Sequence, residues 1–88
     1  MKLKLDYLMP DDVEQAQESA ENLQCPIERM LNKCIVYEKI FYKIDSMGAF
    51  AEGYSLIEVS GYEYYIKMGA EELEKLIDKK RNILINDN

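Results

Sequence analysis

The opening stretch of the chain alternates polar and apolar side chains, which is typical of a half-buried β-strand. Its polar positions are Lys2, Lys4 and Asp6, and its apolar positions are Leu3, Leu5 and Tyr7. Pro10 ends the strand, because proline cannot donate to a β-ladder. One strand cannot form a sheet, and the segments that follow it are predicted to be helical. We therefore expect the strand to pair with the strand of a second copy, in a homodimer.

Two helices are predicted after the strand. The first covers residues 11–23, which carry a narrow apolar stripe, five acidic residues and no basic residue, so that its outer face is strongly negative. The second is predicted to begin at Pro26, because proline is well tolerated at the first position of a helix, and to run to about Asp45. Its apolar arc is too wide for one short helix and one strand to cover, which again indicates self-association.

The remainder of the chain predicts a β-hairpin and a last helix. Two β-rich runs, residues 54–59 and 62–68, are joined by a tight turn, and a helix with early acids and late bases begins near residue 70. Gly48 and Gly53 bracket a turn or loop. The predicted order is β-α-α-β-β-α, a mainly α fold with a short β-ribbon.

The absence of histidine excludes much chemistry. The chain can form no Ser-His or Cys-His nucleophile pair and no His-ligated zinc site. Cys25 and Cys34 have no third thiol with which to complete a metal site, and no phosphate-binding, dinucleotide or nucleophile motif occurs. We expect no metal, no cofactor and no enzymatic activity.

Cysteine usage and hydropathy bear on location. A secreted protein of this size normally carries more than two cysteines, so both are predicted to be buried, reduced thiols. No apolar run approaches the ~20 residues of a membrane span, and the first residues lack the apolar stretch of a signal peptide. We expect a cytoplasmic protein with no membrane partner.

Residues 2–45 resemble the ribbon-helix-helix family of DNA-binding proteins, of the Arc/MetJ type. The matching segments are KLKLDYLMPDD, VEQAQESAENLQ and CPIERMLNKCIVYEKIFYKI. The resemblance implies an intertwined homodimer whose paired N-terminal strands enter the major groove of double-stranded DNA. In this interpretation residues 1–88 form a single domain, in which residues 1–48 are the ribbon-helix-helix core and residues 49–88 add a β-hairpin and a helix.

The resemblance also implies a function and a set of contacts. The protein would be a sequence-specific transcriptional repressor, whose outward ribbon side chains read base edges. Backbone amides at the start of the second helix would bind a phosphate, and nearby basic side chains would add positive charge. The implied DNA-contacting residues are Lys2, Lys4, Asp6, Ile27, Arg29 and Lys33.

The charge balance motivates alternatives. The net charge is −6, spread evenly over both halves without a basic tail, so DNA binding would need a small local patch. The lysines and the arginine would otherwise be ordinary solvated side chains. A second hypothesis is an acidic protein-interaction module. Such a module could be an antitoxin that binds a toxin, or it could be a phage-encoded inhibitor. A third arrangement is a monomer in which the N-terminal strand joins the C-terminal hairpin in a three-stranded sheet.

Overall fold

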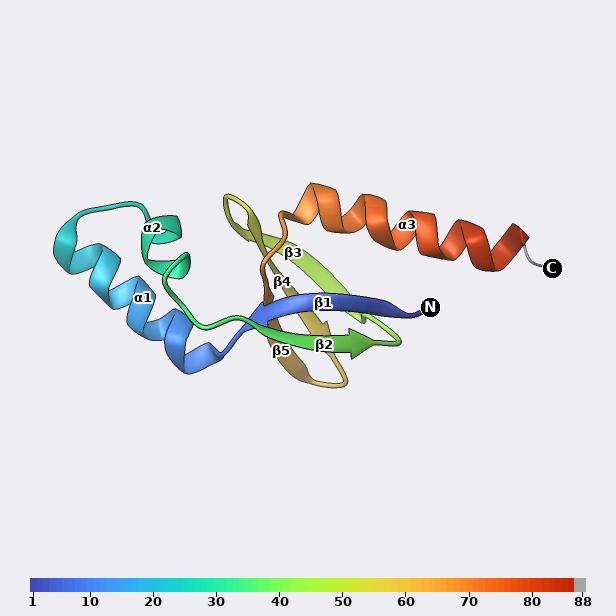
Figure 1. Ribbon diagram of the computed structural model, residues 1–88, viewed down its shortest axis with the longest axis horizontal. Helices are drawn as coiled ribbons and strands as arrows, with labels where there is room; N and C mark the ends of the chain where they lie inside the picture. The colour runs from blue at the N-terminus through green and yellow to red at the C-terminus, as the bar shows by residue number, and fades with distance from the viewer. Residues whose placement is uncertain (87–88) are drawn as a thin grey trace.

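The computed structural model describes residues 1–86, which form an antiparallel five-stranded sheet and three helices (Figure 1). The strands are β1 (Leu3–Leu8), β2 (Tyr37–Phe41), β3 (Ser46–Ala51), β4 (Tyr54–Val59) and β5 (Tyr62–Ile66). The helices are α1 (Pro10–Leu23), α2 (Ile27–Leu31) and α3 (Ala70–Asn86). The first strand, the first helix, the hairpin and the start of the last helix are confirmed.

The predicted fold class, a mainly α ribbon-helix-helix protein, is wrong. The second helix ends at Leu31, and β2 and β3 follow it instead of a helix to residue 45 and a loop. Residues 35–44 are rich in β-branched and aromatic side chains, which lose rotamer freedom in a helix and pack well in a strand. The result is an α/β fold built on one large sheet.

The intertwined β-ribbon is also wrong for this fold, because β1 finds its partners within its own chain. Leu3 to Tyr7 pair antiparallel with β2, and Tyr7 and Leu8 pair antiparallel with β5. The pairing of β1 with the β4–β5 hairpin matches the monomeric alternative, enlarged by β2 and β3 at the two edges.

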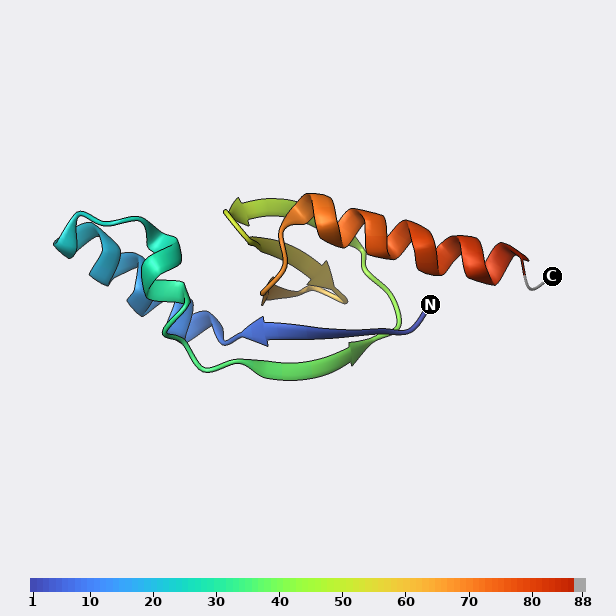
Figure 2. The same cartoon turned by 45° about the horizontal axis from the view of Figure 1, so that its top comes forward.

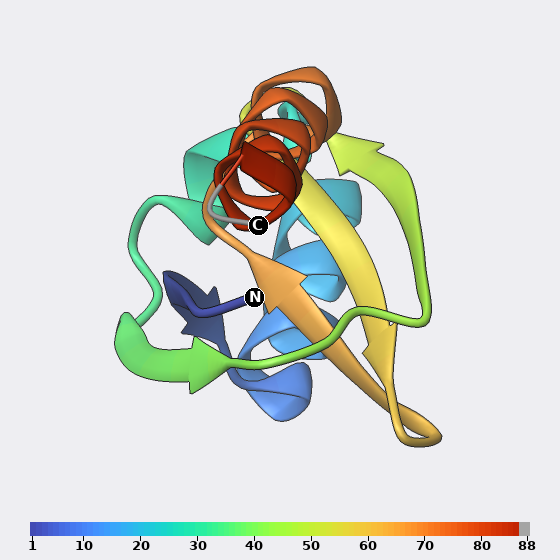
Figure 3. The same cartoon turned by 90° about the vertical axis from the view of Figure 1, so that its right-hand side faces the viewer.

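The strand order is β2-β1-β5-β4-β3, so β2 and β3 are the two edge strands of the sheet. Viewed along the long axis of the molecule, the strands curl around a core that α3 covers (Figure 3). The tight turn of the β4–β5 hairpin contains Ser60 and Gly61, whose φ angles are 52° and 84°. Two successive positive φ values are the signature of a type I′ turn, whose twist suits a two-residue hairpin.

Two apolar cores lie on opposite faces of the sheet. The larger core joins α3 to the concave face through Leu3, Leu5, Phe41, Ile57, Ile66, Leu73 and Ile77. The smaller core joins α1 and α2 to the other face through Leu8, Val13, Ala16, Leu31 and Tyr54. The α1–α2 pair therefore projects from one end of the sheet, and the molecule measures 53 × 21 × 18 Å (Figure 2).

Candidate functional site

The alternation predicted for the first strand is confirmed. Lys2, Lys4 and Asp6 are exposed, whereas Leu3 and Leu5 are buried. However, β1 is paired from Leu3 to Tyr7 with β2 and at Tyr7 and Leu8 with β5, so it belongs to the sheet of its own chain instead of a two-stranded ribbon. The exposed side chains of Lys4 and Asp6 therefore lie on the face of a five-stranded sheet and not on a two-stranded ribbon.

Lys4 already has an anionic neighbour. Its Nζ lies 3.2 Å from Oε1 of Glu38 on β2, and both side chains are more than half exposed. An exposed pair of this kind contributes little to stability. Its effect on recognition is larger, because the carboxylate offsets the positive charge that a phosphate or a base edge would need.

The other predicted DNA contacts lie on α2 or just after it. Ile27 is half-buried against the smaller core, whereas Arg29 and Lys33 are exposed. The carboxylate of Glu28 accepts a hydrogen bond from the backbone N–H of Glu52 at 3.0 Å. The pKa of Glu28 is lowered by hydrogen bonds from its own backbone amide and from that of Glu52. A firmly ionised carboxylate thus stands at the beginning of α2, where a phosphate was predicted to bind.

The two groups of predicted contacts are not brought together. Lys2 lies next to the N-terminus, at the opposite end of β1 from the α1–α2 pair (Figure 1). The residues of α2 lie beside α1. Tyr54 of β4 donates a hydrogen bond from its hydroxyl group to Oδ1 of Asn32, directly after α2. No continuous basic surface results from the six predicted residues.

The most strongly charged feature is a row of four carboxylates on the outer face of α1, which we call the acidic stripe. Its members are Asp11, Glu14, Glu18 and Glu21, all exposed. Spacings of three, four and three residues place them along one side of the helix. The buried residues Val13, Ala16 and Ala20 occupy the opposite side.

Nothing within α1 balances the acidic stripe. The helix contains no basic residue, and no ion pair found in the described residues involves one of its acids. Asp11 suits the positive end of the helix dipole, but Glu21 lies in the last turn, where a negative charge is unfavourable. Like charges three or four residues apart also repel one another. The stripe therefore costs folding free energy.

The sheet repeats this pattern. Asp6 on β1 is directly opposite Glu38 on β2, and Glu58 on β4 is directly opposite Glu63 on β5. All four side chains are exposed. Directly opposed like charges destabilise an antiparallel pair. Helix α1 and the sheet thus both carry carboxylates whose mutual repulsion lowers the stability of the fold.

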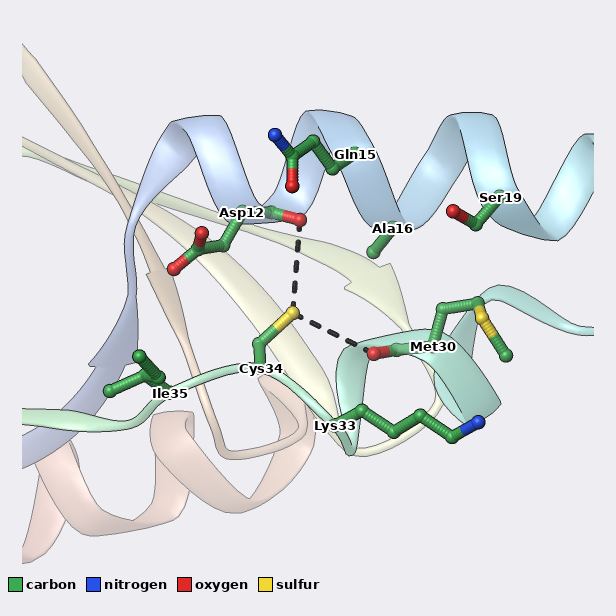
Figure 4. A pocket seen from close by; sticks show the side chains of 8 residues that line it. All are labelled: Asp12, Gln15, Ala16, Ser19, Met30, Lys33, Cys34 and Ile35. Atoms are coloured by element: carbon green, nitrogen blue, oxygen red, sulfur yellow. Dashed lines mark hydrogen bonds between the residues drawn. The ribbon is translucent and has the colours of Figure 1, made fainter.

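A groove of about 280 Å³ runs between α1 and the end of α2 with the residues that follow it (Figure 4). Asp12, Gln15, Ala16 and Ser19 line one side, and Met30, Lys33, Cys34 and Ile35 line the other. The Cys34 thiol lies within hydrogen-bonding distance of two backbone carbonyl oxygens, at 3.7 Å and 3.6 Å. Burial, and to a lesser degree the Asp12 carboxylate, raise the pKa of Cys34. The thiol is therefore neutral near pH 7 and is a poor nucleophile.

The described residues form neither a metal-binding cluster nor a membrane-spanning helix. No group of three or more Cys, Asp or Glu side chains is placed to hold a metal ion there. Among the same residues, none of the helices has the length and apolar character that crossing a membrane requires. Both cysteines are free thiols.

Comparison with known proteins identifies no relative: no family model, no curated protein and no solved structure matches the chain.

The sequence predicted the acidic stripe, because it depends only on a local helix. It missed the exposed apolar segment that forms β2, whose residues were assigned to the interior of a helix dimer. The concentration of Ile, Val and Tyr between residues 35 and 42 was the available signal for an extended strand.

Proposed function

We propose that the protein is an acidic protein-interaction module that binds a basic surface of a protein partner through α1. This is the kind of role that an antitoxin or a phage-encoded inhibitor plays. The observation that carries the proposal is the acidic stripe, four exposed carboxylates on one helix face without a basic neighbour in that helix. Complementary charge across an interface raises the association rate and selects the partner.

The energetic cost of these carboxylates supports the proposal. The stripe and the opposed pair Glu58–Glu63 each oppose folding, and so does the pair Asp6–Glu38, where the ion pair between Lys4 and Glu38 offsets part of the repulsion. A cationic partner would attract these carboxylates and offset the repulsion between them. The proposal includes a cytoplasmic location, which the two free thiols support, and no catalytic step.

Operator binding stays a prediction, now without the dimeric ribbon on which it depended. A simple measurement separates it from the proposed function. A protein that reads DNA should be retained on heparin or on random duplex DNA at low salt. We expect the folded wild-type protein to pass through both without retention.

The direct test compares two charge variants of equal net charge. The stripe variant carries Asp11→Asn, Glu14→Gln, Glu18→Gln and Glu21→Gln. The control variant carries Glu71→Gln, Glu72→Gln, Glu74→Gln and Asp78→Asn, which neutralise four exposed acids of α3. Wild type and both variants are immobilised, and the proteins that each retains from a cell lysate at about 0.15 M salt are identified and then purified.

We expect a basic protein that binds wild type and the control variant with similar affinity and the stripe variant at least about tenfold more weakly. Because exposed charges are screened over about 8 Å at this ionic strength, the interaction should weaken further as salt is added. Equal losses in the two variants would mean that only net charge matters. That result, or equal binding by all three proteins, would contradict a binding site on α1.

A further inference from the structure

The outer edge of β2 is open. β2 ends the strand order of the sheet, and among the described residues only β1 pairs with it. Figure 2 shows β2, in green, below β1 with no other element beyond it. An open edge strand presents a row of unpaired N–H and C=O groups to which another chain can add a strand.

The register identifies the backbone groups that face outward. The backbone N–H of Lys67 donates to the carbonyl oxygen of Asp6, so the peptide groups of Asp6 point toward β5. Because these groups alternate along a strand, those of Leu5 point toward β2 and pair with Lys39. The backbone N–H and C=O groups of the residues on either side of Lys39 therefore point away from β1. Glu38 and Ile40 offer the free donors and acceptors.

The same segment exposes an unusual amount of apolar surface. Within residues 1–81, eight large apolar side chains are exposed, and five of them lie between residues 35 and 42. They are Ile35 (64% exposed), Val36 (39%), Tyr37 (37%), Ile40 (38%) and Tyr42 (67%). Single exposed apolar residues are ordinary, but several along one open edge strand indicate an interaction surface.

We propose that β2 pairs antiparallel with β2 of a second copy, with Ile40 directly opposite the partner's Ile40. The two-fold axis of such a pair is perpendicular to the sheet, so residues opposite each other lie on the same face. A pair centred on Glu38 would oppose two carboxylates, and a pair centred on Lys39 would oppose two ammonium groups. Centring on Ile40 is the register of the three that opposes no like charges.

This register brings together the exposed Ile40 side chains of the two copies. It sets Ile40 against Ile40, Glu38 against the partner's Tyr42, and Lys39 against the partner's Phe41. It uses the outward-facing peptide groups of Glu38 and Ile40, as the hydrogen-bonding pattern requires. A single added strand pair is a small interface, and interfaces below about 1,200 Å² form weak, reversible complexes. The dimer is therefore a concentration-dependent one, and it is independent of the proposed function of α1.

The test measures molecular mass by sedimentation equilibrium from about 1 µM to about 1 mM. We expect wild type to pass from monomer to dimer over this range. Ile40→Lys places two positive charges on the two-fold axis, and we expect it to weaken the dimer at least about tenfold. Tyr62→Lys introduces the same charge at an exposed residue of β5, away from β2, and should leave the dimer within about threefold of wild type.

A second pair of variants tests the register and does not depend on Ile40. In the proposed dimer, Tyr42→Lys sets an ammonium opposite the partner's Glu38, whereas Tyr42→Glu sets a carboxylate there. Each change occurs twice in the dimer, so we expect the dissociation constants of these two variants to differ by at least about tenfold. Tyr62→Lys and Tyr62→Glu, which carry the same charges on β5, should differ by less than about threefold.

Circular dichroism of each variant confirms that the fold is retained. A wild-type protein that is still monomeric at the highest concentration would overturn the proposal and would leave the edge to a strand of another protein. A dimer that is indifferent to the charge at position 42 would overturn the register. A dimer that Ile40→Lys weakens and Tyr62→Lys does not, with dissociation constants that differ between Tyr42→Lys and Tyr42→Glu, supports both the dimer and its register, whereas a dimer that Ile40→Lys leaves unchanged contradicts both.

Discussion

The ring of Phe41 on β2 stands edge-on to the ring of Tyr64 on β5, with centroids 5.1 Å apart, although β1 runs between the two strands. Tyr7 of β1 meets the same Tyr64 ring at 5.6 Å. Three neighbouring strands therefore share one aromatic cluster. Edge-to-face pairs contribute about 0.5–1.5 kcal/mol beyond the burial of their area. The cluster secures the edge strand β2 to the centre of the sheet.

Replacing Phe41 by alanine should therefore detach β2. Phe41 is 2% exposed, and the loss of a buried phenylalanine side chain typically costs about 3–5 kcal/mol. We expect Phe41→Ala to lower the free energy of unfolding in urea by that amount. The adjacent Tyr42 is 67% exposed, so Tyr42→Ala should change it by less than about 0.5 kcal/mol. Equal effects at the two positions would mean that residue 41 is not in the core.

A substitution at Ser55 should stabilise the protein. Its side chain is fully buried on the concave face, and its Oγ has no hydrogen-bond partner among the described residues. A buried hydroxyl group without a partner costs about 1–3 kcal/mol. Ser55→Ala removes the hydroxyl and should raise the free energy of unfolding by about 1 kcal/mol, measured by the same urea titration. The exposed Ser46 provides the control, because Ser46→Ala should be nearly neutral. A destabilised Ser55→Ala variant would contradict the prediction.

The raised pKa of Cys34 predicts a loss of stability at alkaline pH. Burial, followed by the Asp12 carboxylate, makes the folded protein hold the thiol proton more tightly than the unfolded chain does. This contribution to stability is complete below the unfolded pKa, about 8.5, and is lost as pH rises through the higher folded value. The free energy of unfolding should therefore fall more steeply above about pH 8.5 in wild type than in Cys34→Ala.

A second measurement checks the same thiol directly. The thiolate is the reactive form, so iodoacetamide should modify Cys34 more slowly in the folded protein than in urea, at the same pH. Tyr54, whose pKa is also raised by burial and, to a lesser degree, by Cys34 and Glu28, adds its own pH dependence in wild type and in Cys34→Ala, and the part of that dependence that comes from Cys34 is lost in the variant. Identical slopes in wild type and Cys34→Ala would show that the environment of Cys34 does not stabilise its protonated form.

Short sequence patterns correctly predicted the elements whose conformation depends on neighbouring residues alone. The alternation of Lys4 and Leu5, the proline at residue 10 and the turn at Ser60-Gly61 each specify their own conformation. The segment after Leu31 has β-branched and aromatic residues that favour a strand, but no periodicity that decides its conformation. Apolar residues occupy so many of its positions that helical and extended periodicities both fit, and pairing with β1 decides between them.

The sheet edges could not be predicted for the same reason. β3 contains Gly48, Ala49 and Ala51, which have low strand propensity, and it forms because β4 offers it a partner. The exposure of Ile40 depends on which strand ends the sheet, and only the complete topology determines this. The acidic stripe was predictable because a helix fixes its own faces, whereas the open edge of β2 was not.

Glu21 connects the stability of α1 with its proposed function. It lies in the last turn of the helix, where its charge opposes the helix dipole and repels Glu18 one turn earlier. Glu21→Lys reverses both effects, and we expect it to raise the free energy of unfolding by about 0.3–1 kcal/mol.

Glu14→Lys makes the same change in net charge in the first half of the helix, away from the last turn, and should be less stable than Glu21→Lys. Thermal unfolding at low salt measures the difference between the two variants, which should shrink near 1 M salt, where screening acts within about 3 Å. Both variants should nevertheless bind the basic partner more weakly than wild type, because both interrupt the acidic stripe. Increased stability together with weakened binding in Glu21→Lys would show that this carboxylate serves recognition at the expense of the helix. A Glu21→Lys variant that is no more stable than Glu14→Lys would contradict the electrostatic account of α1.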